Sequence, residues 1–304
     1  MQRETNEEMR EKTSEETSGA SLPQKSNKGW KTVLIVFCCI LLFACAVLGA
    51  LQLGVLYCRN TWSQWSPNYA KEDISALLYK ENLTEQEYDT LYRQTGLTKL
   101  AINDMRFDAS GRNRILRIQN FLFQPHEVRE EKFAPYTYMN EMDEFATIAR
   151  LQDGDIIVTS TTYVSWWRYG HGALVVDGER ELLAESLSPG TNSKLTNADN
   201  FTYLANFIVL RPKASAEIKK QVVTYAKENL LDIPYDMVTG ILNKKNPEKL
   251  KGTQCAHLVW YAYKKFGIDL DSNGGAIVKP QDMFLSEQVE VVQAFGFDLD
   301  RLWK

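Results

Sequence analysis

The sequence predicts an α+β protein with one membrane-spanning helix near its N-terminus. Three observations indicate this class: an uncharged apolar run over residues 33–57, a cluster of short strand patterns over 152–212, and helix patterns on both sides of that cluster. Because the strands follow one another instead of alternating with helices, the pattern favours α+β over α/β. The net charge of −4 gives no reason to expect a nucleic-acid partner.

The N-terminal part of the chain divides into a tail and a membrane helix. Residues 1–29 contain almost no large apolar side chains and carry dense charge of both signs, so we expect a disordered tail. We expect the membrane helix over residues 30–58, because the apolar run can cross about 30 Å of hydrocarbon and Trp30, Tyr57 and Trp62 are placed as interfacial anchors. Slightly more basic residues precede the run than follow it, which favours a cytoplasmic tail at the plasma membrane and an extracytoplasmic domain.

Residues 59–150 are expected to form a helical arm. The segment LTEQEYDTLYRQTGL places Thr84 three residues before Glu87, which is the spacing of a capping box. The segment GRNRILRIQNFLF carries apolar residues along one helix face. We therefore expect the apolar side chains of the arm to belong to a core and the arm to pack on the domain that follows.

Residues 151–304 are expected to form the main domain. Its strand patterns are DGDIIVTS, GHGALVVDG, ELLAES and YLANFIVLRP. The segment SAEIKKQVVTYAKENL then predicts an amphipathic helix capped by Ser215. After a loop and a basic polar segment, apolar residues at helical spacing predict a last helix within Thr253–Gly267, with Cys255 in its first turn and Gly267 as its end.

Cys255 is the first candidate for chemistry. A thiol in the first turn of a helix lies beside unpaired backbone N–H groups and the positive end of the helix dipole, which favours the thiolate. Cys255 is also the only cysteine after Cys58, so the domain has no internal disulfide to account for it. On this helix alone, a small buried apolar residue and a nucleophile are both consistent with the pattern.

A cysteine nucleophile needs a base, and the chain has three histidines. His257 follows Cys255 by two positions, about 200° around the helix axis, so it cannot reach the thiol. His126 follows a proline among charged residues and is expected to be exposed in a loop. His171 opens an apolar strand between two glycines, and it is therefore the predicted base.

A third polar group should hold the His171 ring. The strands 171–176 and 180–186 predict a hairpin, and its turn length decides which side chains meet. With a three-residue turn, His171 faces Glu185 directly at about 5 Å between Cβ atoms; with a two-residue Asp-Gly turn, Glu185 lies on the opposite face. We prefer Glu185 to Asp177, which belongs to the turn, and the register stays open.

Five segments of the chain carry a resemblance to a known family: DGDIIVTS, YGHGALVV, AES, IPYD and TQCAHLVWYAYKKFGIDLD. Together they resemble the permuted branch of the NlpC-type papain-like cysteine hydrolases, the YiiX- and YebB-like group. That group is related to lecithin:retinol acyltransferase-like proteins. The similarity covers roughly residues 150–290, and the histidine strand precedes the cysteine helix as in that group. The resemblance implies a circularly permuted papain-like fold whose triad falls on Cys255, His171 and Glu185. Tyr235 then lines the pocket or assists the oxyanion, although a plain loop tyrosine fits equally well.

The resemblance implies a thiol hydrolase that needs no cofactor or metal. Common members have Asp-Cys-Ser where this chain has Gln254-Cys255-Ala256, which leaves the substrate class open. We expect a membrane-anchored enzyme that cleaves an amide bond in the cell envelope, in a peptidoglycan stem peptide. The alternatives are a lipid acyl hydrolase or acyltransferase with the same triad, and a non-catalytic envelope binding module. No metal site is expected, because Cys255 and His257 diverge on their helix and no other Cys/His cluster exists in the sequence.

Overall fold

The computed structural model describes residues 28–61, 64–130, 137–139, 145–164 and 167–303. Residues 1–27 of the expected tail, the anchor residue Trp62 and the side chain of Tyr57 lie outside this description. The N-terminal helix up to Gln52 forms one unit, and the chain from Leu53 onward forms a second. Each unit is described by itself.

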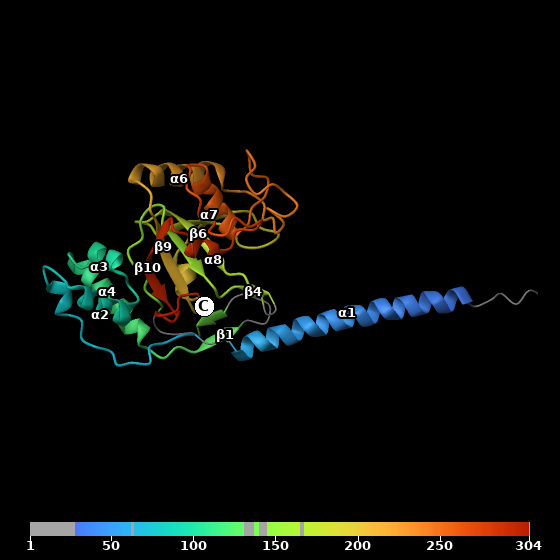
Figure 1. Cartoon of the computed structure of the whole chain (residues 1–304), viewed down its shortest axis with the longest axis horizontal. Helices are drawn as coiled ribbons and strands as arrows, with labels where there is room; N and C mark the ends of the chain where they lie inside the picture. Colours follow the sequence, from blue (N-terminus) through green and yellow to red (C-terminus); the bar gives the residue numbers. More distant parts are fainter. Residues whose placement is uncertain (1–27, 62–63, 131–136, 140–144, 165–166, 304) are drawn as a thin grey trace, which may run out of the picture. The chain divides into compact units, whose positions relative to one another are not determined.

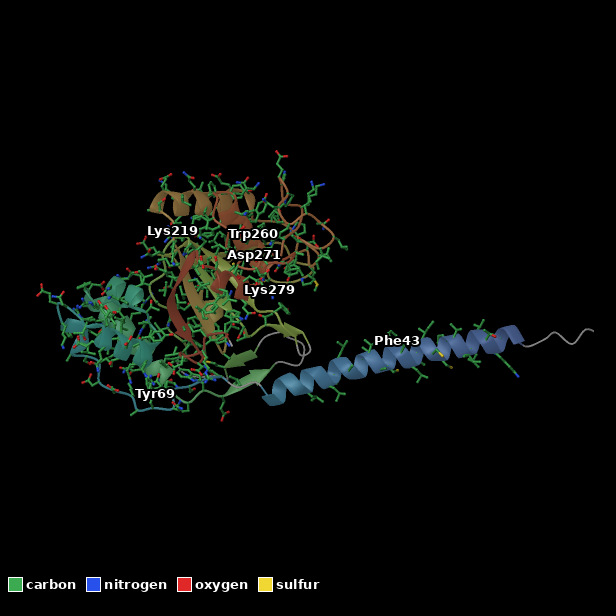
Figure 2. All side chains as sticks on the ribbon, viewed as in Figure 1. Phe43, Tyr69, Lys219, Trp260, Asp271 and Lys279 are labelled. Carbon is green, nitrogen blue, oxygen red and sulfur yellow. The ribbon has the colours of Figure 1, made fainter. Side chains whose placement is uncertain are left out.

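The N-terminal helix α1 runs from Lys28 to Thr61. Its stretch Gly29–Gly54 has 26 residues and a mean hydropathy of 3.0, so it is long and apolar enough to cross a membrane. Apolar side chains project from it into the surroundings, as Phe43 does in Figure 2. The prediction of an N-terminal helix with the length and composition of a membrane span is confirmed.

The second unit is built on a six-stranded sheet in which every neighbouring pair is antiparallel, in the order β10-β9-β3-β6-β7-β8 (Figure 1). The strands are β3 Ile156–Thr159, β6 His171–Asp177, β7 Leu182–Glu185, β8 Lys194–Asn197, β9 Phe207–Pro212 and β10 Val289–Phe295. Four of them follow the predicted strand patterns, whereas β8 and β10 were not predicted. The α+β class is confirmed.

Helices form the middle of the arm, over residues 77–122. Its elements are the 3₁₀ turn η1 Leu77–Tyr79 and the helices α2 Glu85–Thr95, α3 Lys99–Met105 and α4 Ala109–Leu122. The capping box at the start of α2 is confirmed: the Glu87 amide donates to the Thr84 hydroxyl, and the Glu87 carboxylate accepts from the Thr84 amide. The arm ends in an unpredicted pair of short strands, β1 Val128–Glu130 and β2 Thr137–Met139. A second short pair, β4 Tyr163–Val164 and β5 Trp167–Arg168, precedes β6.

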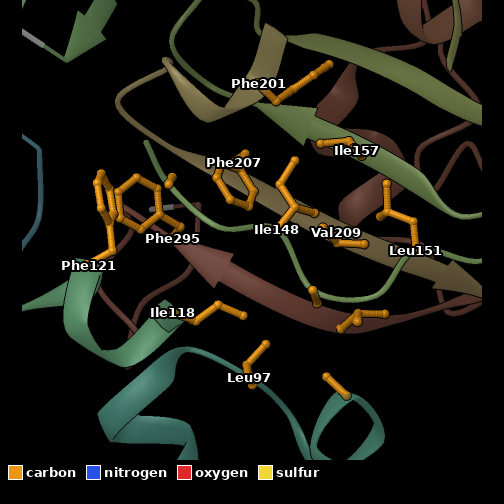
Figure 3. Close-up of a cluster of buried hydrophobic side chains, with 14 of the residues drawn as sticks. Leu97, Ile118, Phe121, Ile148, Leu151, Ile157, Phe201, Phe207, Val209 and Phe295 are labelled. Carbon is orange, nitrogen blue, oxygen red and sulfur yellow. The ribbon is translucent and has the colours of Figure 1, made fainter. Parts of the chain in front are cut away.

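Alternate residues of each strand point to opposite sides of the sheet, and both sides are covered except at the edge strand β8, which is mostly exposed. One face packs on the arm, so that Leu97 and Ile118 share a core with Ile157 of β3 (Figure 3). The other face packs on α6 Ala216–Asn229 and α7 Cys255–Lys264, whose core includes Ile156 of β3. Two short helices, α5 Asp199–Thr202 and α8 Pro280–Phe284, complete the unit.

The C-terminal strand β10 ties the arm to the sheet. The side chain of Gln293 accepts from the amide of Ala149 at 2.6 Å and donates to the carbonyl of Thr147 at 2.9 Å. The amide of Ala294 donates to the carbonyl of Gly96 at the end of α2, at 2.9 Å. The arm and the sheet are therefore joined by buried polar contacts as well as by their shared core.

Candidate active site

Cys255 is the first residue of α7, as the sequence predicts, and it is 3% exposed. The residue before it, Gln254, has extended backbone, and its side-chain oxygen accepts from the Cys255 thiol at 3.5 Å. The Gln254 amide nitrogen donates to the carbonyl of Val278 at 2.9 Å, which fixes that side chain. The thiol therefore lies in the first turn of a helix whose start has no side-chain cap, where the helix dipole favours negative charge.

His171 is the first residue of β6, where it pairs with Thr159 of β3, and it is also 3% exposed. The Cys255 side chain lies close enough to the ring to raise the pKa of His171. Phe201 of α5 stacks on the ring with 5.8 Å between centroids and 21° between planes. The structure thus brings together the two residues that the sequence places 84 positions apart, at the ends of one strand and one helix.

Glu185, the last residue of β7, holds the other side of the His171 ring. The ring Nε2 lies 2.7 Å from the Glu185 Oε2, and both side chains are buried. The other carboxylate oxygen accepts from the hydroxyl of Thr196 in β8. Since Nε2 is bound to Glu185, Nδ1 is the ring nitrogen that remains for Cys255.

The register that joins β6 and β7 differs from both sequence expectations. Leu174 pairs with Ala184, and a bulge shifts the pairing so that Asp177 pairs with Leu182 across a four-residue turn. Direct pairing of His171 with Glu185 is therefore wrong, because Glu185 is offset by two residues. An even offset keeps both side chains on one face of the sheet, so they meet diagonally. Asp177 instead accepts from the amide of Arg180 within the turn.

The charged forms of His171 and Glu185 stabilise each other. Burial lowers the pKa of His171, but the hydrogen bonds with Cys255 and Glu185 outweigh it and raise that pKa to about 10. Burial raises the pKa of Glu185, but the bonds from His171 and Thr196 hold it below its ordinary value. The site therefore favours an imidazolium paired with a carboxylate, and a cationic imidazolium stabilises a neighbouring thiolate.

Two tyrosines lie close enough to Cys255 for its charge to change the pKa values of their hydroxyls. Burial, followed by the charge of Cys255, raises the pKa of Tyr235, and the same two causes raise the pKa of Tyr169 to about 12. Both phenols therefore stay protonated and can donate hydrogen bonds. Tyr235 is held in place by its backbone, which bridges to Thr253, two residues before Cys255, and donates to the carbonyl of Thr191 at 3.0 Å.

The sequence analysis did not single out Tyr169, Phe201 or Thr196. Tyr169 belongs to the YGHG motif, and its spacing of two from His171 was the available signal. Phe201 and Thr196 reach the site only through the pairing of β8 with β7 and the turn into α5. No local pattern reports such contacts.

The other two histidines are structural. His257 is buried; its Nδ1 accepts from the hydroxyl of Thr253 at 2.9 Å and its Nε2 donates to the carbonyl of Lys245 at 2.7 Å. Burial lowers the pKa of His257 to about 4, so the ring is neutral. His126 is half-buried and bonded to the carbonyl of Phe121 at 2.8 Å, so the expectation of an exposed loop histidine is wrong. Within the described residues, no group of three or more His, Cys, Asp or Glu side chains could hold a metal ion.

Comparison with known proteins gives one distant relative. No protein-family model matches the chain, and no solved structure matches it. The chain is 28% identical over 141 residues to the uncharacterized protein YycO of Bacillus subtilis strain 168. The matched stretch covers 46% of this chain and 54% of the relative, so the chain spans about half the length of that relative. The likeness shows neither a family nor an activity.

Proposed function

We propose that this protein is a thiol hydrolase in which Cys255 is the nucleophile, His171 the base and Glu185 the group that orients the base. One observation carries the proposal: the His171 Nε2 lies 2.7 Å from a buried carboxylate, and the Cys255 side chain is near enough to the same ring to raise the pKa of His171. Burying a charged pair costs free energy, and a histidine whose pKa is strongly raised beside a thiol is a candidate for catalysis, whereas burial keeps His257 neutral.

The proposed reaction proceeds in two steps. The Cys255 thiolate attacks the carbonyl carbon, a C–S bond forms, and the carbonyl electrons move to oxygen, where the Cys255 amide and the Tyr235 hydroxyl are the proposed donors. Collapse of this intermediate breaks the C–N bond, and the leaving amine takes the proton from His171. In the second step, His171 removes a proton from water, which adds to the thioester, and the C–S bond breaks to restore the thiolate.

The proposed fold is a permuted papain-like domain, and the proposed substrate is an amide of the cell envelope. The order of the elements supports the fold, because the histidine strand β6 precedes the cysteine helix α7 and both pack in one unit. The apolar helix α1 supports a single-pass anchor. The proposed orientation, with the enzyme domain outside the cytoplasm, rests on the small excess of basic residues before the apolar run. A peptidoglycan stem peptide is then the substrate that the domain would meet.

The test compares the wild-type chain with Cys255→Ala and His171→Ala in a nanodisc or mild detergent. We expect wild type to release new amino groups from purified stem peptides and both variants to lose this activity. In parallel, alkylation of Cys255 by iodoacetamide is followed by peptide mass spectrometry against pH; His171→Ala should move the onset of alkylation to higher pH. An unchanged alkylation profile in His171→Ala contradicts the proposed pair, whatever the substrate is.

A lipid acyl group is the second candidate substrate. It is favoured by three exposed apolar side chains, Met237, Ile241 and Leu242, in the loop that leads to α7. The same variants are assayed for release of fatty acid from phospholipid. Fatty acid release that depends on Cys255, without stem-peptide cleavage, assigns the site to lipid instead.

A further inference from the structure

The loop over residues 236–252 lies between α6 and α7 (Figure 1). It exposes large apolar side chains. Met237 is 65% exposed, Ile241 57% and Leu242 78%. Two exposed rings of this unit are covered by a cation instead: Arg112 lies 4.5 Å from the ring centre of Tyr79, and Arg106 lies 4.2 Å from that of Phe107. A cluster of three aliphatic side chains within six residues is the kind of exposed apolar patch that marks an interaction surface.

The first half of this loop is built around Asp236. Its carboxylate accepts from the amide of Val238 at 2.9 Å, the hydroxyl of Thr239 at 3.0 Å and the side-chain amide of Asn243 at 2.8 Å. These bonds hold the turn from both ends. Asp236 is thereby committed to the fold of the loop, and it keeps its negative charge, because burial raises its pKa but these bonds outweigh burial and hold that pKa below the ordinary value.

The backbone of the turn fixes the direction of its apolar side chains. The carbonyl of Val238 accepts from the amides of Ile241 at 2.9 Å and Leu242 at 3.0 Å. Gly240 has φ +89°, and a Cβ there would lie 1.8 Å from the carbonyl oxygen of Ala276. The turn is therefore seated on neighbouring backbone, and Ile241 and Leu242 are presented outward by a preformed structure.

Basic side chains flank the apolar cluster. Lys244, Lys249 and Lys251 are exposed, and together with Tyr235 they line a groove of about 390 Å³. The loop carries two carboxylates, the half-buried Asp236 and the exposed Glu248, so the three exposed lysines leave a small excess of positive charge. Apolar side chains beside several lysines are the combination that binds an anionic lipid surface, with burial at the interface and attraction to phosphate acting together.

We propose that the loop 236–252 is a membrane-contact surface that docks on an anionic lipid bilayer. Ile241, Leu242 and Met237 enter the interface, and the lysines contact the lipid phosphates. A bilayer is the partner favoured by the chain itself, because α1 is long and apolar enough to span one. The proposal does not depend on catalysis, although Tyr235 places the groove beside Cys255.

The experiment uses the full chain in nanodiscs of phosphatidylcholine alone or mixed with phosphatidylglycerol. Hydrogen–deuterium exchange is followed by mass spectrometry on peptides from the loop and, as a folding control, from β3 and β6. We expect exchange in the loop to slow by about threefold or more in the anionic discs, and this protection to fall at high salt. Equal exchange in the two discs overturns the proposal.

Matched variants separate docking from general effects. Ile241→Glu with Leu242→Glu should remove the protection while β3 and β6 exchange as in wild type, and Lys244→Glu with Lys249→Glu should do the same. Leu285→Glu changes another exposed leucine, outside this loop at the end of α8, and should leave the protection unchanged. Protection that survives in both loop variants, or is lost equally in Leu285→Glu, contradicts docking through this surface.

Discussion

Replacing Glu185 by Gln tests how the base is held. The variant keeps the shape of the side chain but removes the charge that lies 2.7 Å from the His171 Nε2 in a buried setting. A hydrogen bond to a charged group contributes about 1.5–3 kcal/mol. At 1.36 kcal/mol per pKa unit, its loss lowers the pKa of His171 by about 1–2 units. We therefore expect a fall from about 10 in the wild type.

The assay is a pH titration of ¹³C-labelled histidine by NMR. The chain has three histidines, and burial lowers the pKa of both His126 and His257, so the resonance that titrates above the ordinary range belongs to His171. Thr196→Val is the matched control, because it removes a bond to the same carboxylate but keeps the charge. We expect it to leave the pKa of His171 near the wild-type value, because the negative charge beside the ring remains.

The sign of this prediction follows from linkage. A histidine whose pKa is raised on folding stabilises the native state fully below its unfolded pKa and loses that contribution as pH rises to the folded value. Wild type should therefore lose this contribution to stability between about pH 6.5 and about pH 10, and Glu185→Gln over a narrower window. A His171 titration that stays in place in Glu185→Gln refutes the reasoning about the carboxylate.

Three further predictions concern stability. Folding lowers the pKa of His257 from 6.5 to about 4. Between these two pH values the unfolded chain is protonated at His257 and the native state is not, so the free energy of unfolding falls by about 3 kcal/mol as the pH drops from 6.5 to 4. Urea titrations at several pH values measure this loss, and His257→Gln should flatten it. Phe201→Ala removes a buried ring that stacks on the base and should cost about 3–5 kcal/mol by denaturant titration, with the Cys255 alkylation profile shifted as well. Gly240→Ala meets both a left-handed φ and a carbonyl at 1.8 Å, so it should lower the melting temperature more than Gly190→Ala, which has a similar φ of +84° but no atom within 4 Å. Equal melting temperatures for the two glycine variants would show that the backbone around residue 240 shifts to accommodate the added Cβ, and would contradict the prediction.

Local patterns predicted the elements that carry the nucleophile and the base. The apolar spacing after Thr253 marked a helix, and α7 begins at Cys255. The apolar run after Gly170 marked a strand, and β6 begins at His171. These patterns are sufficient because both elements bury side chains in the core, and burial produces a regular spacing of apolar residues along a short stretch of sequence.

The contacts that complete the site depend on pairing at a distance. The turn after Asp177 has four residues, with Glu181 at φ 54°, whereas its Asp-Gly sequence indicated a shorter turn. The strand β8 is mostly exposed and lacks the alternation that identifies a half-buried strand. Thr196 could therefore not be placed next to Glu185 before the sheet order was known.

The position of β10 has a consequence for biosynthesis. During synthesis, α1, the arm and the cysteine helix α7 emerge from the ribosome before β10. The arm is bonded to β10 through Gln293 and Ala294. Until β10 emerges, the arm has no complete surface on which to dock, and its apolar face is open to chaperones and proteases. A nonsense mutation shortly after α8 would thus leave every residue of the candidate triad in the chain and still yield no native domain.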